Sequence, residues 1–184
     1  MNLLGWSYRY VGPPDVRALV RPEAEGRSIH SAADFDEWAS AQAAVELAEP
    51  FTFVIDSEGV LRLAPRRSEH VVCAGGGRVL GAGEMSFREE SGQWVVAEVS
   101  NQSTGYCPDI SSWPVVAKAL AAAGIECPSC FTHEVVFRRC PSCSQLNVVR
   151  EEDFVCVFCD EDLPREWNVD WTGVDWTGPD RAGR

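Results

Sequence analysis

The middle of the chain alternates apolar and polar residues in the manner of β-strands. Apolar side chains occupy every second position in residues 51–55 and 61–63, and the turn-forming sequence Asp-Ser-Glu-Gly lies between them at 56–59. This arrangement predicts a β-hairpin. Glycines separate the apolar runs that follow, so we expect further short strands at residues 71–73, 78–80, 84–87 and 94–99. Together these segments predict an antiparallel meander.

Two other segments repeat apolar residues at the spacing of an α-helix. Ser31 can cap a helix that runs to about Leu47, because apolar residues recur there every three or four positions. Pro114 and Gly124 bracket a second helix, expected at residues 113–123. The pattern therefore predicts an α+β fold with a central antiparallel sheet and flanking helices.

The net charge narrows the range of partners. The chain has 184 residues and a formal charge of -12, which repels phosphate backbones and anionic lipids. Nucleic acid is therefore not expected as a partner, and an acidic surface favours another protein. The N-terminus lacks the apolar stretch of a signal peptide, and the longest apolar run, 115–125, is interrupted by Lys118. We expect a cytoplasmic protein without a membrane segment.

The spacing of the cysteines is the sequence feature that says most about function. Six of the eight cysteines form three C-x-x-C pairs, which in a reducing compartment indicates metal binding rather than disulfides. The strongest pattern is Cys140-Pro-Ser-Cys143 followed after twelve residues by Cys156-Val-Phe-Cys159. Zn²⁺ takes four soft ligands in a tetrahedron, and two such turns supply two each. With strands at 146–149 and 154–155, this segment resembles a zinc ribbon; redox-active pairs without metal are the alternative.

The remaining cysteines leave several interpretations open. Cys127 and Cys130 could compete for the same zinc ion, or join Cys73 and Cys107 in a second four-thiolate site. They could also be reduced cysteines of a linker, and this interpretation is favoured. Residues 135–137 are apolar and are expected to add a strand to the main sheet.

A catalytic site is an alternative to a purely binding role. His70, Glu84 and Cys107 carry the side chains for it, because a cysteine nucleophile needs a nearby base and is often displayed on a loop after a strand. The loop from Ser100 to Cys107 has that position. The competing interpretation is structural, with a buried inert cysteine, a histidine that binds a loop carbonyl and a carboxylate that caps glycine-rich turns.

Several motifs together resemble a family of uncharacterised bacterial proteins from GC-rich genomes. They are Ser-Glu-His at 68–70, Gly-Ala-Gly-Glu at 81–84, the loop at 99–108 and Phe-Arg-Arg-Cys-Pro at 137–141. The resemblance covers about residues 51–168 and implies a recurring sheet module and a C-terminal zinc ribbon, without a settled activity. Thr104 departs from the loop pattern of the broader set. Cys127 and Cys130 lie outside the shared pattern, which implies that zinc belongs to the other four cysteines.

These observations predict three parts and a function. We expect an α+β domain at 1–126, a cysteine-rich zinc-ribbon segment at 127–166 and a flexible tail at 167–184 that holds a tandem Val-Asp-Trp-Thr-Gly repeat. The favoured function is that of a zinc-binding protein-binding or adaptor module. The runner-up is a hydrolase or group transferase that uses His70, Glu84 and the loop. A third hypothesis, docking on nucleic acid through Arg138, Arg139 and Arg150, conflicts with the net charge.

Overall fold

The computed structural model describes residues 7–169, which form two compact units that divide between Val136 and Phe137. The predicted tail therefore lies outside the described residues from position 170 onward, including nearly all of its tandem repeat. Within residues 7–169, no helix has the length and apolar character that crossing a bilayer requires.

The first unit is built on a five-stranded antiparallel sheet in the order β1-β3-β2-β4-β5. This confirms the predicted α+β fold. The strands are β1 (Arg27–Ile29), β2 (Phe51–Asp56), β3 (Leu61–Ala64), β4 (Val79–Glu90) and β5 (Gln93–Ser100). The helical segments of this unit are α1 (Pro14–Arg17), η1 (Pro22–Ala24), α2 (Ala32–Ser40), α3 (Ala44–Leu47), α4 (His70–Cys73), η2 (Ile110–Ser112) and α5 (Trp113–Ala122).

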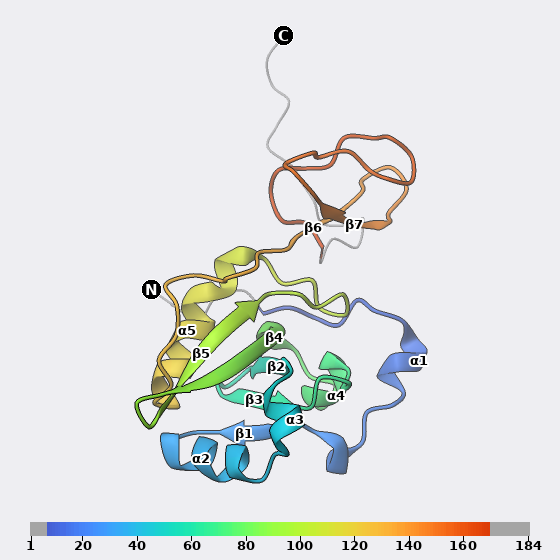
Figure 1. The fold of residues 1–184 in the computed structure, drawn as a ribbon. Coiled ribbons are helices and arrows are strands. Elements are labelled where there is room, and N and C mark those ends of the chain that lie inside the picture. Colours follow the sequence, from blue (N-terminus) through green and yellow to red (C-terminus); the bar gives the residue numbers. More distant parts are fainter. Residues whose placement is uncertain (1–6, 170–184) are drawn as a thin grey trace. The chain divides into compact units, whose positions relative to one another are not determined.

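Helices cover both faces of the sheet. Figure 1 shows α2 beside β1. Helix α5 packs against β4, and both helices contribute to the main apolar core. Phe51 and Phe53 of β2 belong to this core. Thr52 points to the opposite face, where its hydroxyl donates to the Ser68 carbonyl at 3.0 Å, just before α4. The central strand is therefore covered on both sides, and all its residues are buried.

The predicted helix from Ser31 to Leu47 is two helices. The Ser31 hydroxyl accepts the Asp34 amide at 3.2 Å and caps α2, as expected. The helix ends at Ser40, and the Gln42 side chain donates to a carbonyl of its last turn, that of Trp38, at 2.9 Å. The Glu46 carboxylate then accepts the Ala43 amide and starts α3. The apolar residues keep their helical spacing through both helices. The break between the helices is instead marked by side-chain hydrogen bonds to the backbone.

The prediction of a strand at 71–73 is wrong, because these residues form α4. The amides of Val72 and Cys73 both donate to the Glu69 carbonyl, and the chain leaves the helix through Gly75 and Gly76, which have positive φ angles. Burial of this apolar segment against β2 and β3 outweighs its β-propensity.

The two strands predicted at 78–80 and 84–87 are one continuous strand, β4. Its glycines are close-approach positions rather than separators. A Cβ on Gly81 would lie 2.9 Å from the Val116 side chain of α5, and a Cβ on Gly83 would overlap the carbonyl oxygen of Ser100. Glycine is required here because neighbouring chain segments pass directly over the strand.

A two-stranded sheet is formed by β6 (Val136–Arg139), which starts at the last residue of the first unit, and β7 (Leu146–Val149) of the second unit. Residues 135–137 therefore do not extend the main sheet, and β7 does not pair with 154–155. The first C-x-x-C turn connects β6 to β7, so pairing the two strands closes a short hairpin around it. Val155 forms an isolated bridge with Asp162 instead.

Candidate metal centre

Two C-x-x-C turns bring four cysteine sulfurs together in the second unit. The sulfurs of Cys140, Cys143, Cys156 and Cys159 all lie within 4.8 Å of one another. The Sγ atoms of Cys140 and Cys159 are 3.6 Å apart, as are those of Cys143 and Cys156. A tetrahedron with metal–sulfur bonds of about 2.3 Å has edges of about 3.8 Å. The cluster therefore has the size and the donor set of a four-thiolate metal site.

Hydrogen-bond donors of the backbone and of a side chain favour the thiolate form of Cys156. Burial acts to raise the pKa of the Cys156 thiol, but hydrogen bonds from the backbone amides of Phe158 and Cys159 and from Asn147 lower that pKa to about 6. For Cys159, a hydrogen bond from the Glu161 amide acts to lower the pKa, whereas the neighbouring sulfurs of Cys143 and Cys140 raise it to about 12. The hydrogen bonds thus favour a thiolate at Cys156, and the repulsion between neighbouring thiolates is relieved by a cation between the sulfurs.

Asn147 is a supporting residue that the sequence pattern did not single out. Its side chain is 3 % exposed, and its amide nitrogen lies 3.5 Å from the Cys156 sulfur and donates to the Gln145 carbonyl. Its amide oxygen accepts the Val157 backbone amide at 3.0 Å. This one side chain connects β7 to the second cysteine turn. The sequence feature that could have indicated this supporting role is a polar residue inside an otherwise apolar strand.

Two of the three arginines considered for nucleic-acid docking hold the backbone of this unit. Arg138 is buried, and its guanidinium donates to the carbonyls of Pro164 and Arg165. Arg139 donates to the carbonyl of Ser144 at 2.9 Å. Both guanidinium groups therefore stabilise loops around the cysteine cluster, and their charges are directed at carbonyl oxygens.

The other cysteines do not form a second cluster. Within residues 7–169, the four sulfurs described above are the only group of three or more potential ligands that could hold a metal ion. Cys73 and Cys107 are buried in the first unit, Cys127 packs at the edge of its core, and Cys130 is exposed. The structure does not assemble the hypothetical site from these four residues.

His70 lies at the start of α4, where it is held by the sheet. Its Nε2 atom lies 2.9 Å from the Gly83 carbonyl oxygen, so the neutral ring donates this hydrogen bond. Burial lowers the pKa of His70, while the Gly83 carbonyl and the negative charge of Glu84 act against that shift. The structure thus brings His70 close to Glu84, and the hydrogen bond to Gly83 links α4 to β4.

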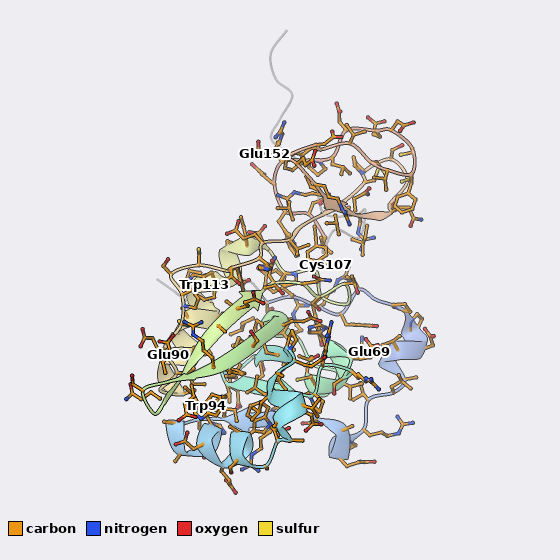
Figure 2. All side chains as sticks on the ribbon, viewed as in Figure 1. Glu69, Glu90, Trp94, Cys107, Trp113 and Glu152 are labelled. Carbon is orange, nitrogen blue, oxygen red and sulfur yellow. The ribbon has the colours of Figure 1, made fainter. Side chains whose placement is uncertain are left out.

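Cys107 lies on the loop after β5. Figure 2 shows it beyond one end of the β4–β5 pair, with Glu90 and Trp94 at the other end. The thiol is 1 % exposed and donates to the Thr104 carbonyl at 3.3 Å. No hydrogen bond joins it to His70 in the described part of the chain. The pair expected of a cysteine nucleophile and its base is not formed in this structure.

Two open grooves lie on the first unit. One has a volume of about 360 Å³ and is lined by Val45, Pro50 and Arg66 among others. The other is smaller, about 110 Å³, and is lined by Glu84 and His133 among others. Neither lining includes His70 or Cys107. Glu84 therefore lines a small groove that the other two candidates do not line.

The chemistry of the cysteine cluster follows from its ligand count. Four protein sulfurs fill a tetrahedral coordination sphere and leave no position for a substrate, which is typical of structural rather than catalytic metal sites. Searches of protein-family models, curated proteins and solved structures found no match to this chain. Four cysteines on two turns could therefore hold one metal ion.

Proposed function

We propose that this protein binds one Zn²⁺ ion through its four clustered cysteines and uses the zinc-stabilised unit to bind another protein, as an adaptor module. Zn²⁺ suits four soft thiolates in a tetrahedron and has no redox chemistry of its own. The small core cluster at the cysteine site supports a structural role for the ion, because its buried members are only Cys140, Cys156 and Leu163. Such a core needs a metal to fold stably.

The observation that carries the binding role is the distribution of exposed apolar side chains. Seven large apolar residues are exposed in the described chain, and four of them lie between residues 148 and 158 of the metal-binding unit. Exposed apolar groups that gather on a small unit favour a protein interface. The enzyme hypothesis is less favoured because His70 and Cys107 are each bound to a backbone carbonyl.

The metal part of the proposal is tested on the full chain purified under reducing conditions. Elemental analysis should give one zinc per chain, and Cys156→Ser should lose it. Cys130→Ser is the matched control, because this cysteine also belongs to a C-x-x-C pair but lies outside the cluster. Iron at one per chain, or unchanged zinc in Cys156→Ser, would contradict the assignment.

The binding part is tested by affinity capture from a bacterial extract. The wild-type chain and Cys130→Ser should retain the same protein partner, and Cys156→Ser should lose it, because the binding surface depends on the metal. Equal capture by all three chains would contradict the proposal. A hydrolase or transferase activity that disappears in His70→Gln would favour the alternative function instead.

A further inference from the structure

The two cysteine turns differ in a way that metal binding does not require. The residues between the cysteines are Pro141 and Ser142 in the first turn and Val157 and Phe158 in the second. Val157 is 75 % exposed and Phe158 is 61 % exposed. The first turn shows that this position can be filled without large apolar side chains. Two adjacent apolar side chains on the second turn therefore call for another explanation.

Val155 extends the apolar surface. It is 38 % exposed, whereas Cys156 between Val155 and Val157 is fully buried. The backbone thus points the cysteine into the metal cluster and the two valines outward. We use the name knuckle patch for the three exposed apolar residues Val155, Val157 and Phe158.

Acidic residues flank the knuckle patch on both sides in the sequence. Asp160, Glu161 and Asp162 follow it after Cys159 and are all exposed. The Cys156 amide donates to the Glu161 carbonyl, and Val155 forms its bridge with Asp162, so this acidic segment runs alongside the patch. Residues 151–153, Glu-Glu-Asp, precede the patch and are exposed as well. We call residues 160–162 the acidic rim.

We propose that the knuckle patch, together with the acidic rim, binds a protein surface in which an apolar centre is surrounded by arginine or lysine side chains. This inference rests on the proposed function and names the chemistry of its partner. Apolar contact would supply binding free energy. The opposite charges at the edge would orient the partner and raise the rate of association. The rim places three negative charges beside the patch.

Charge also argues against two other occupants. A second copy of this chain would bring a formal charge of -12 and the same acidic rim to the interface. The chain's own segment 170–184 offers tryptophans, but its three aspartates at 170, 175 and 180 outnumber its two arginines at 181 and 184. Like charges at an interface oppose binding. A basic partner is therefore favoured over both.

The test uses synthetic amphipathic peptides as probes of this chemistry. One peptide combines leucine with arginine, a second replaces arginine with glutamate, and a third replaces leucine with serine. Each is titrated into the zinc-loaded, ¹⁵N-labelled full chain. The leucine–arginine peptide should bind at least tenfold more tightly than either control, with shifts concentrated at residues 155–162. Equal binding of the glutamate or serine peptide would overturn the proposal.

Matched variants connect this binding to the patch. Val157→Ser combined with Phe158→Ser copies the polar character of the first turn, so zinc should be retained while affinity falls at least tenfold. Val45→Ser is the control, because Val45 is 72 % exposed but lies in the first unit. It should change affinity by less than twofold. Asp160→Lys combined with Glu161→Lys should exchange the preference toward the glutamate peptide.

The same variants separate the outcomes. Unchanged peptide affinity in the serine double variant overturns the patch, as does self-association that this variant abolishes. Shifts at residues 155–158 caused by Trp171→Ala and Trp176→Ala would identify the chain's own terminal segment as the occupant and would also overturn it. If the serine variant still captures the extract partner but Cys156→Ser does not, the proposed function stands and the patch fails.

Discussion

At the scale of single residues, Asn101 shows how one side chain can organise a loop. Its side chain is fully buried, and its amide nitrogen donates to the carbonyls of Pro108 and Val135 at 2.9 and 2.8 Å. Its amide oxygen accepts the Val135 amide at 2.7 Å. Asn101 thus acts as a substitute for strand pairing, and joins both ends of the loop after β5 to a segment more than thirty positions later.

Asn101→Ala should destabilise the first unit by about 2–3 kcal/mol, because buried backbone groups at both ends of the loop lose their partners. Chemical denaturation of the full chain measures this. Gln102→Ala is the control, since Gln102 is exposed and its substitution should stay within about 0.5 kcal/mol. Unchanged stability of Asn101→Ala, together with lost partner capture, would show that the loop is a binding site instead.

His70 predicts a dependence of stability on pH. Burial lowers its pKa in the folded protein below the ordinary value of 6.5, so the unfolded chain takes up the proton first as the pH falls. The free energy of unfolding should therefore decrease below about pH 6.5, by at most about 1.4 kcal/mol per pH unit from this group. Above that pH the ring is neutral in both states and the effect is absent.

The contribution of His70 is isolated by comparing the wild-type chain with His70→Gln between pH 7 and pH 5. Glutamine can still donate to the Gly83 carbonyl but does not titrate, so the variant should lose less stability on acidification. His30→Gln, at an exposed position, should follow the wild type. Identical slopes for His70→Gln and wild type would contradict a buried neutral imidazole.

At the scale of elements, β4 depends on residues that a strand usually avoids. Its glycines let α5 approach the sheet on one side and let the chain at Ser100 pass directly over Gly83. The carbonyl oxygen of Gly83 itself accepts the hydrogen bond from His70 of α4. A single position in the strand thus accommodates the chain at the end of β5 and holds α4 in place.

Gly83→Ala should therefore destabilise the first unit by about 2–3 kcal/mol, because the added methyl group meets backbone atoms that cannot move aside cheaply. Thermal unfolding provides the measurement. Gly77→Ala is a suitable control: its Cβ would lie 3.4 Å from the nearest atom, at the Ala74 carbonyl, and its effect should stay within about 1 kcal/mol. Similar melting temperatures for the two variants would contradict the close approach.

At the scale of the whole molecule, the two units draw their stability from different sources. The first unit buries aromatic and aliphatic side chains from α2, α5 and the sheet, including Phe35, Phe53 and Leu120. In the second unit, the buried cluster at the cysteine site consists of two cysteines and one leucine, and Phe137 and Val169 are the other buried apolar residues of its described part. Burial of apolar surface stabilises the first unit, whereas metal–thiolate bonds would have to stabilise the second unit.

Metal removal should therefore unfold one unit and leave the other folded. A strong zinc chelator at neutral pH should abolish the dispersed amide signals of residues 137–169, since structural zinc contributes on the order of 10 kcal/mol to such a unit. The signals of the first unit should persist, and added zinc should restore the rest. Loss of all signals together would contradict separate sources of stability, and no loss would contradict a structural metal.

The sequence alone carried the local features whose cause is local. The alternation of Phe51, Phe53 and Ile55 predicted a strand, Ser31 predicted a helix start, and these are confirmed. The spacing of the two C-x-x-C pairs predicted which sulfurs would meet, because short turns fix the geometry of their own ligands. The α+β class follows from the same periodicities.

Contacts between distant segments decided the rest. Val71 and Val72 are helical because they pack against β2 and β3, and the glycines of β4 remain in the strand because α5 and the chain at Ser100 cross it. Asn147 supports Cys156 only after the hairpin has formed. The local sequence pattern of these residues does not indicate which distant segment of the chain will pack against them. Three features depend on the tertiary structure, so only the folded chain determines them: the burial of a segment, the close approach of two segments, and the hydrogen bonds that support a metal ligand.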